Sequence, residues 1–500
     1  MANVCSRESD DEVRPRPEGT AVTRPALTLD PDRALPAEPT VRAIARELLA
    51  GTQDLPLVSM HGHVDVDLLL ADEPFRDPAE LLVVPDHYLL RLLVSQGVSL
   101  DALGVPRRDG GAVERDPREI WRQVASRWHV LRGTPTRFWL EHELVDVLGV
   151  TVRPSAQTAD ETYDQMAEAL AKPQTRPRAL FERFQLELLA TTDDATAPLD
   201  AHAALENAGL PGRVVPTFRP DALLDAAAPG WGQRVARLDE LTGVRVRDAR
   251  TLVEALAVRR GHFVERGALA TDHGMRTLRA ERLDDHEADA LVVAALRAAE
   301  AGHALDAQQA GALAGHLLFE MARTSCEDGL VMQLHPGVLR GYDTQVDALR
   351  GPDVGYDIPV ATDFVHGLRP LLEAFGHHPR FRLVVFTVDE DAYSRELAPL
   401  AGVYPAMRLG APWWFLDTPD SMRRFREAVT DTAGFYNTTG FVDDTRAFCS
   451  IPARHDLARR VDAGFLARLV AEHRLDLDEA HETAVDLAYR LPLASYQRPI

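Results

Sequence analysis

Short apolar runs that end in polar residues recur along most of the chain, and stretches of helical spacing separate many of them. The first run is LPLVSMHGHVD, and seven more follow: LELLATTDD, RVVPTFRPD, GALATDHG, LVMQLHPG, LVVFTVDED, YPAMRLGAPWW and GFVDDTR. Apolar residues recur with helical spacing in residues 40–50, 222–241, 276–321 and 419–432. Strands that alternate with helices predict an α/β fold with a parallel sheet, and eight such strands predict a TIM-like (β/α)8 barrel.

Two parts of the chain depart from this alternation. Residues 1–38 are rich in proline, arginine and acidic residues with little apolar periodicity, which predicts a disordered N-terminal tail. Residues 64–184, after the first strand, have helical spacing broken by proline and glycine, which predicts a helical insertion. We therefore expect one barrel domain over residues 39–500 that includes this insertion.

The histidines that end the first run suggest a metal site. Side chains two apart on a strand point to the same face, so His61 and His63 are expected to project side by side. When the barrel closes, Asp444 of the eighth run lies beside them, and two histidines with one carboxylate leave open positions on a catalytic ion. The alternatives are a hydrogen-bonded or solvated histidine pair and a helix-capping turn at Asp444.

Charge narrows the class of partner. The chain has 77 acidic and 55 basic residues and a net charge of -22, which disfavours binding to nucleic acid or to anionic membrane surfaces. Arg219, Arg340 and Arg446 nevertheless fall at or just beyond predicted strand ends. Because a guanidinium group binds a carboxylate bidentately, this placement favours a small carboxylate-bearing substrate, although any one of these arginines is by itself typical of a protein surface.

Further candidates for chemistry are an imidazole pair, a phenol and an indole. His87 and Tyr88 lie in the predicted insertion, and His335 ends the fifth strand; each can donate or accept a proton. Trp413 follows the seventh strand and is suited to forming a wall for a sugar-like ligand. The alternatives are that His87 caps a helix and that Trp413 belongs to the core.

Cysteine and lysine usage exclude several kinds of site. The three cysteines, Cys5, Cys326 and Cys449, are widely spaced and predict neither a disulfide framework nor a cysteine-based zinc site, which fits a reducing cytoplasm. The single lysine, Lys172, lies in a predicted loop, so Schiff-base chemistry and a carboxylated-lysine metal bridge are disfavoured. No signal-peptide core and no apolar run of about 20 residues is found in the sequence.

Several motifs, taken in order from about residue 40, together resemble the uronate isomerase (glucuronate isomerase) family of the amidohydrolase superfamily. They are HGH, DHYLLR, FWLEHEL, TTDD, TFRPD, TDHG, HPGVLR with GPDVGYD, PWWF, and VDDTRAF with RHDLARR. The resemblance implies a distorted (β/α)8 barrel. It also implies isomerisation of hexuronates, such as D-glucuronate to D-fructuronate and D-galacturonate to D-tagaturonate, through a cis-enediol.

The resemblance further implies roles for the candidate residues. His61, His63 and Asp444 would hold a divalent metal, for which we expect zinc or manganese. The substrate-binding residues would be Arg219 and Arg446, with His87, Tyr88 and His335 lining the site, and we expect Asp444 and Tyr88 to handle the proton. A symmetric homo-oligomer is also expected, as is common for barrel enzymes of this size.

Two other functions fit the same residues. One is a mononuclear metal-dependent hydrolase, such as a lactonase that acts on a sugar-acid lactone. The other is a sugar-acid sensor without catalysis. Turnover of a hexuronate distinguishes the isomerase from both.

Overall fold

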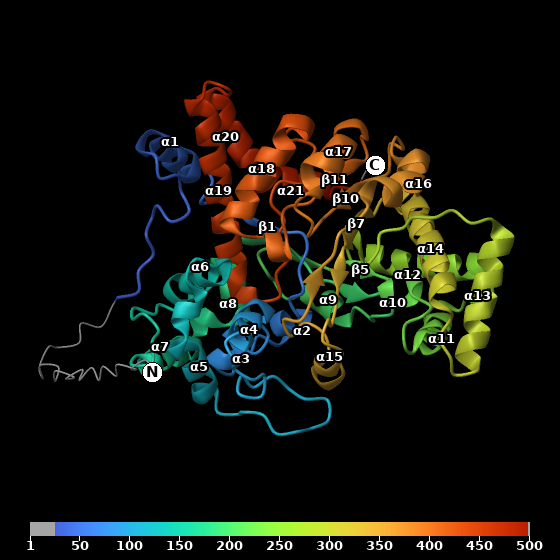
Figure 1. The fold of residues 1–500 in the computed structure, drawn as a ribbon, viewed down its shortest axis with the longest axis horizontal. Helices are drawn as coiled ribbons and strands as arrows, with labels where there is room; N and C mark the ends of the chain where they lie inside the picture. The colour runs from blue at the N-terminus through green and yellow to red at the C-terminus, as the bar shows by residue number, and fades with distance from the viewer. Residues whose placement is uncertain (1–25, 499–500) are drawn as a thin grey trace, which may run out of the picture.

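Parallel strands lie at the centre of the protein in a computed structural model that describes residues 26–498 (Figure 1). The strands are β1 (Leu57–Ser59), β2 (Leu186–Ala190), β3 (Asp193–Asp194), β4 (Arg213–Val215), β5 (Phe218–Arg219), β6 (Ala270–Met275), β7 (Val331–Pro336), β10 (Leu383–Val385) and β11 (Met407–Leu409). They pair in the orders β1-β2-β4 and β11-β10-β7-β6-β5-β3, and every pair is parallel. A separate antiparallel pair joins β8 (Val338–Leu339) to β9 (Ile358–Pro359).

Seven of the eight expected runs contain these strands, and the eighth run differs. Among the described residues, GFVDDTR pairs only through an isolated parallel bridge of Thr445 with Gly62, and Thr438, just before the run, forms a second such bridge with Leu409. The amide of Phe441 donates instead to the carbonyl of Leu487 (3.0 Å), so this part of the run gives its hydrogen bond to a helical segment. The run therefore lies between the first and seventh strands without forming a regular ladder.

One buried apolar cluster takes side chains from all eight runs. Its members include Val58, Met60, Leu188, Ala190, Val215, Ala270, Val331, Val384, Trp413 and Val442. Tyr496, which follows α21 (Leu491–Ser495), is buried in the same cluster, and its hydroxyl donates to Oε1 of Gln333 on β7 (2.7 Å). The alternating inward positions of the strands thus share one core.

Helices of the second half of the chain cover the strands, and a large apolar cluster lies between them. They are α9 (Asp200–Leu205), α10 (Asp221–Leu224), α11 (Trp231–Thr242), α12 (Ala249–Glu265), α13 (Asp285–Glu300), α14 (Ala307–Asp328), α16 (Phe364–Phe375), α17 (Ala398–Val403), α18 (Pro419–Ala433), α19 (Ile451–Ala471) and α20 (Leu477–Val485). Their ends follow local sequence signals. Asp248 forms a capping box at the start of α12, and Gly329 ends α14 in the left-handed conformation.

The segment between β1 and β2 is helical throughout its regular elements. It contains α2 (Val66–Ala71), α3 (Pro78–Leu82), α4 (His87–Val94), α5 (Pro117–Ser126), α6 (Pro135–His142), α7 (Ala159–Leu170) and α8 (Pro177–Arg183). Most of the buried residues of this segment form a second apolar cluster. Figure 1 shows these helices gathered at one end of the molecule, opposite α11–α14.

Residues 26–38, assigned to the N-terminal tail from the sequence, lie against the folded body. Leu27 is buried, and its amide donates to the carbonyl of Thr151 (2.8 Å). Arg33 forms an ion pair with Asp456 of α19 (2.8 Å), and α1 (Pro39–Ala50) follows directly. The remainder of the expected tail, residues 1–25, falls outside the described residues. None of the helices in the described part of the chain is long and apolar enough to cross a membrane.

Candidate active site

A cavity of about 320 Å³ opens where the carboxyl ends of the parallel strands meet the first helices of the insertion. Residues from β1, β5, β7 and the seventh and eighth runs line one side, and α4 and the segment after α15 (Thr344–Arg350) line the other. All ten residues singled out from the sequence line this cavity: His61, His63, His87, Tyr88, Arg219, His335, Arg340, Trp413, Asp444 and Arg446. Positions nearly 400 residues apart thus share one space.

His61, His63 and Asp444 lie together, and each offers a ligand atom to the same point. Oδ1 of Asp444 lies 3.2 Å from Nε2 of His63 and 3.7 Å from Nε2 of His61. Burial raises the pKa of Asp444, but the two histidines outweigh it and hold that pKa below its ordinary value. Burial and the neighbouring His335 lower the pKa of His61 to about 4, so its imidazole is neutral and free to ligate near pH 7.

The neighbouring Asp443 explains why the eighth run carries two aspartates. Its carboxylate accepts a hydrogen bond from the hydroxyl of Ser59 on β1 (3.1 Å) and lies 3.1 Å from Nε2 of His455 on α19. Asp443 therefore anchors the eighth run to the first strand, while Asp444 faces the cavity.

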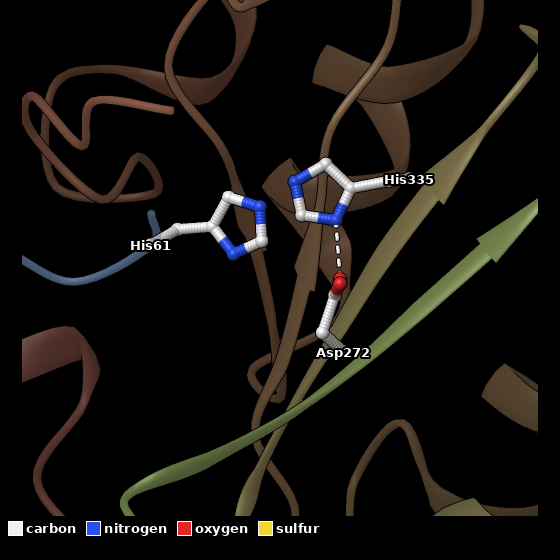
Figure 2. A group of neighbouring side chains, drawn as sticks. All are labelled: His61, Asp272 and His335. Carbon is white, nitrogen blue, oxygen red and sulfur yellow. Dashed lines mark hydrogen bonds and ion pairs between the residues drawn. The ribbon is translucent and has the colours of Figure 1, made fainter. Parts of the chain in front are cut away.

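A second group of ligand atoms comprises His61, Asp272 and His335, and Figure 2 shows these three side chains facing one another. Nδ1 of His335 lies 2.6 Å from Oδ1 of Asp272, which is also contacted by Arg219 (3.1 Å to Oδ2). Burial raises the pKa of Asp272, but Arg219 and His335 outweigh it and lower that pKa well below its ordinary value. The ionised carboxylate can only accept, so Nδ1 of His335 carries a proton and donates a hydrogen bond to Asp272.

The donors in these two groups fit a divalent transition metal. Imidazole nitrogens and a carboxylate oxygen are the ligands that such ions prefer. Nδ1 of His61 and Nε2 of His335 are buried and have no hydrogen-bond partner, which leaves polar atoms to be satisfied by a bound group. The two groups share His61, so the site is a single region with two adjacent sets of potential ligands.

Aromatic rings fix the position of His335. Its imidazole is stacked between His61 and Phe386, with ring centroids 4.4 and 4.2 Å apart, and the edge of Trp413 meets it at 4.7 Å. Trp413 is buried in the central cluster and lines the cavity as well. Trp413 is thus a core residue whose side chain also forms part of the cavity wall.

Tyr88 is held at the opposite side of the cavity by two buried charged residues. Its hydroxyl contacts Oδ2 of Asp417 (2.9 Å) and the carbonyl of Trp414 (3.0 Å), and Arg454 forms an ion pair with the same carboxylate of Asp417. Burial, followed by the negative charge of Asp417, raises the pKa of Tyr88 well above its ordinary value. The phenol is therefore protonated near neutral pH, and its hydroxyl donates toward Asp417 and the carbonyl of Trp414.

His87 precedes Tyr88 at the start of α4 and is stacked on Trp414, with ring centroids 5.3 Å apart. The helix is capped by Asp86, whose side chain accepts from the amides of Tyr88 and Leu89, so His87 is not the cap. Burial, followed by the positive charge of Arg446, lowers the pKa of His87 to about 3. A neutral imidazole therefore faces the cavity near pH 7.

The cavity arginines fall into two settings. Arg219 is partnered by two carboxylates, Asp221 (2.7 Å) and Asp272 (3.1 Å). Arg340 and Arg446 instead share the single carboxylate of Asp353, at 2.9 and 3.0 Å. We call Arg340, Asp353 and Arg446 the mouth cluster, and His61, His63, Asp272, His335 and Asp444 the strand-end cluster.

Several cavity residues have roles that sequence reasoning did not assign. Asp353, Arg454 and Glu143 line the cavity, and burial raises the pKa of Glu143 to about 8, with a further contribution from Asp86. Asp272 and Asp417 are not among the described lining residues but contact His335 and Tyr88, which are. Asp272 carries a usable signal, because the polar residues TDHG follow the apolar start of the fourth run, although β6 itself continues to Met275. Asp353, Arg454 and Glu143 lie in loops and helices, where only their place in the motifs GPDVGYD, RHDLARR and FWLEHEL distinguishes them. Asp417 lies two residues beyond PWWF and in none of these motifs.

Comparison with known proteins places the chain among isomerases of sugar acids. Residues 40–494 match the family model described as glucuronate isomerase. The uronate isomerase of Phenylobacterium zucineum is 51% identical over 476 residues, which cover 95% of this chain and 98% of the relative. The uronate isomerase of Rhizobium meliloti is 49% identical over 469 residues, with coverages of 94% and 99%.

Solved structures agree with this placement. The crystal structure of glucuronate isomerase from Caulobacter crescentus superposes with a TM-score of 0.91 at 47% identity and covers 95% of this chain and 98% of its own. The uronate isomerase from Thermotoga maritima superposes with a TM-score of 0.86 at 26% identity, with coverages of 94% and 100%. The described fold, with its parallel sheets, is thus closely similar to two crystallised members of one enzyme group.

Proposed function

The chain belongs to the glucuronate isomerase family, and from this we propose roles for the residues of the cavity. It is an isomerase of hexuronates, which moves the carbonyl group of the open-chain sugar acid from carbon 1 to carbon 2. The reaction needs a base for the carbon-2 proton, an acid that returns a proton to carbon 1, and groups that stabilise the cis-enediol between them. The observation that carries the assignment is that one cavity holds candidates for all three tasks.

We propose that Asp444 and Tyr88 move the protons. Asp444 is kept ionised by His61 and His63, as a base must be, and Tyr88 is kept protonated, as an acid must be. His87 and His335 present neutral imidazoles or unpartnered ring nitrogens to the same space and are suited to hydrogen bonds with the sugar hydroxyls. General acid and base catalysis of this kind contributes typically 10²–10⁴-fold.

We propose that His61, His63 and Asp444 hold the divalent metal, which is zinc or manganese. This set is favoured over the set with Asp272, because Asp272 already has Arg219 and His335 as partners, whereas Asp444 opens onto the cavity. Asp272 then acts by orienting His335, as carboxylates commonly do behind ligating or reacting histidines. A metal in this position supplies Lewis acidity toward the substrate oxygens.

We propose that the arginines bind the anionic parts of the substrate. Arg340 and Arg446, in the mouth cluster, are suited to the carboxylate on carbon 6, because both are more than two-fifths exposed and share the carboxylate of Asp353, with Asp357 further away at 4.0 Å from Arg340. Arg219, held by Asp221 and Asp272, faces the strand-end cluster and is suited to the enediol oxygens. Trp413 supplies an apolar wall next to His335.

The alternative of a metal-dependent hydrolase is not favoured. Relatives at about 50% identity over nearly the whole chain are uronate isomerases. Lys172 is about half exposed and pairs with Glu168 of α7 (2.9 Å), so it offers no carboxylated-lysine bridge between metals. A putative metal-dependent hydrolase from Lactobacillus casei shares only the fold, at 16% identity and a TM-score of 0.51.

We also propose that the eight runs close into a distorted (β/α)8 barrel. The supporting facts are the two parallel sheets, the bridge between Gly62 and Thr445, and the shared central cluster. In this proposal residues 39–500 form one catalytic domain in which residues 64–184 are an insertion. A symmetric homo-oligomer in a reducing cytoplasm completes the proposal, supported there by the free cysteines Cys326 and Cys449.

Incubation of the metal-replete protein with D-glucuronate or D-galacturonate in deuterated water tests the reaction. We expect D-fructuronate or D-tagaturonate to form, and deuterium to appear at carbon 1 where the base exchanges its proton with solvent. Ketose formation is the criterion. Opening of a sugar-acid lactone without any ketose from either uronate would overturn the assignment.

A further inference from the structure

Two cavity arginines share one carboxylate, and that carboxylate makes one contact to each. Oδ1 of Asp353 lies 2.9 Å from Nη1 of Arg340, and Oδ2 lies 3.0 Å from Nη2 of Arg446. The side chains of Arg340 and Arg446 are 44% and 42% exposed, and that of Asp353 is 22% exposed. The mouth cluster is therefore open to an entering ligand and keeps one positive charge more than negative.

The other cavity arginines have no such surplus. Arg219 lies between two carboxylates, and Arg454 is buried in an ion pair with Asp417. A further carboxylate near the mouth cluster, Asp357, is 4.0 Å from Arg340 and accepts the amide of Gly341 through its Oδ1. The charge available to a ligand at this end of the cavity is thus set mainly by Asp353.

The chain around Asp353 is fixed by contacts other than the two arginines. Two residues shortly before Asp353 bind the helical insertion. Arg350 forms an ion pair with Asp101, and the amide of Arg108 donates to the carbonyl of Leu349 (2.8 Å). Asp353 itself has φ +64°, a conformation that non-glycine residues rarely adopt. The backbone just before Asp353 is therefore anchored independently of the two guanidinium groups that its carboxylate contacts.

We propose that Asp353 is a specificity-determining residue that limits the mouth cluster to ligands with one negative charge. This inference rests on the proposed binding of the carbon-6 carboxylate by Arg340 and Arg446. With Asp353 in place, a carboxylate meets one net positive charge and is neutralised. A phosphate dianion of similar size would bring a second negative charge, which the single net positive charge of the mouth cluster does not neutralise, close to Asp353.

Coulomb's law gives this selection a direction. The repulsion between Asp353 and a ligand scales with the charge of the ligand, so removing the negative charge of Asp353 favours a dianion twice as much as a monoanion. Any change in how the arginines are positioned affects both ligands. The ratio of their affinities therefore isolates the charge of Asp353.

The test compares the wild-type protein with Asp353→Asn at pH 8, where a phosphate monoester is a dianion. The measurements are the KM of D-glucuronate and the competitive inhibition constants of D-glucose 6-phosphate and D-glucose 6-sulfate. The sulfate has the shape of the phosphate but one charge. We expect the inhibition constant of the phosphate to fall on the order of tenfold relative to both the KM and the sulfate constant.

Asp347→Asn is the matched control, because Asp347 lies on α15 of the same segment and is not among the described residues that line the cavity. It makes the same change in net charge, and its affinity ratios should equal those of the wild type. If Asp353→Asn lacks turnover, calorimetric binding of the same three ligands gives the same ratios.

The outcomes are separable from those of the proposed function. Wild-type protein that converts no uronate contradicts the proposed function itself. Wild-type protein that converts uronate, with unchanged phosphate-to-sulfate and phosphate-to-uronate ratios in Asp353→Asn, overturns the role of Asp353 alone. Equal shifts for phosphate and sulfate would also overturn it, because shape and not charge would then decide.

Discussion

The strand-end cluster and the mouth cluster both contribute residues to one cavity and differ in burial. His61, Asp272 and His335 are almost completely buried, and Asp272 is contacted by a histidine and an arginine. Arg340 and Arg446 are more than two-fifths exposed and share one carboxylate. The carboxylates of the first cluster are therefore paired with neighbouring side chains, whereas the second cluster still has accessible positive charge to offer.

This difference separates chemistry from recognition. Groups that move protons need fixed protonation states, and buried partners provide these by shifting the pKa of Asp444 down and the pKa of Tyr88 up. Groups that capture a charged substrate from solution need accessible charge. Substitutions in the strand-end cluster should therefore act mainly on kcat, and substitutions in the mouth cluster mainly on KM.

The largest effect is expected for Asp444→Asn. The amide cannot accept the carbon-2 proton and is a poorer metal ligand, so kcat should fall by about 10²–10⁴-fold. Steady-state kinetics and elemental analysis of protein purified without chelator measure the two losses, with His61→Ala as a second variant for metal content. A kcat within tenfold of the wild type would remove Asp444 from the chemistry.

Asp272→Asn should have the next largest effect, because it replaces the charged acceptor that fixes the tautomer of His335 with a neutral amide that can accept or donate. We expect kcat to fall roughly 10–100-fold while metal content stays close to that of the wild type. Asp221→Asn is the matched control, since Asp221 contacts Arg219 but not His335. Loss of metal from Asp272→Asn would show that Asp272 is itself a ligand.

Arg446→Gln tests the recognition side of the comparison. Loss of a charge-assisted contact to the substrate carboxylate costs roughly 1.5–3 kcal/mol, which corresponds to about 10–100-fold in kcat/KM. We expect most of this loss in KM. A loss confined to kcat would mean that Arg446 belongs functionally with the strand-end cluster.

The smallest expected effect concerns pH and the partner of Tyr88. Burial raises the pKa of Asp417 to about 6, against the opposing effect of Arg454. Below that pH Asp417 becomes protonated and no longer accepts from Tyr88 as a carboxylate, so wild-type kcat should fall as pH decreases through about 6. In Asp417→Asn this decline should disappear, and the rate at pH 8 should be several-fold lower. An unchanged acid limb would contradict the link between Asp417 and Tyr88.

The strand-end cluster could be predicted from the sequence because its geometry follows from one simple rule. His61 and His63 directly follow β1, and parallel strands bring their carboxyl ends together, so Asp444 and His335 fall into the same cavity. No local rule of this kind applies to Asp353, Asp417 or Arg454. Their positions depend on how the segment after β7, the loop before α18 and helix α19 pack against the insertion.

The same limit explains the differences in the fold. The eighth run has the composition of a strand, but its ladder is replaced by the bond from Phe441 to Leu487, which comes from a distant helical segment. Residues 26–38 lack apolar periodicity, yet Leu27 and Arg33 find partners in residues 151 and 456. Such long-range partners leave little trace in local sequence.

The bond between Ser59 and Asp443 has a consequence for the order in which the protein can mature on the ribosome. These residues are 384 positions apart, and the central core also requires Tyr496 against Gln333. A nascent chain therefore carries an open-edged sheet for most of its synthesis. During this time Val58 and Met60 lack their packing partner Val442, which is synthesised almost 400 residues later. Closure of the cavity becomes one of the last events, and we expect metal acquisition to follow release of the chain rather than accompany its translation.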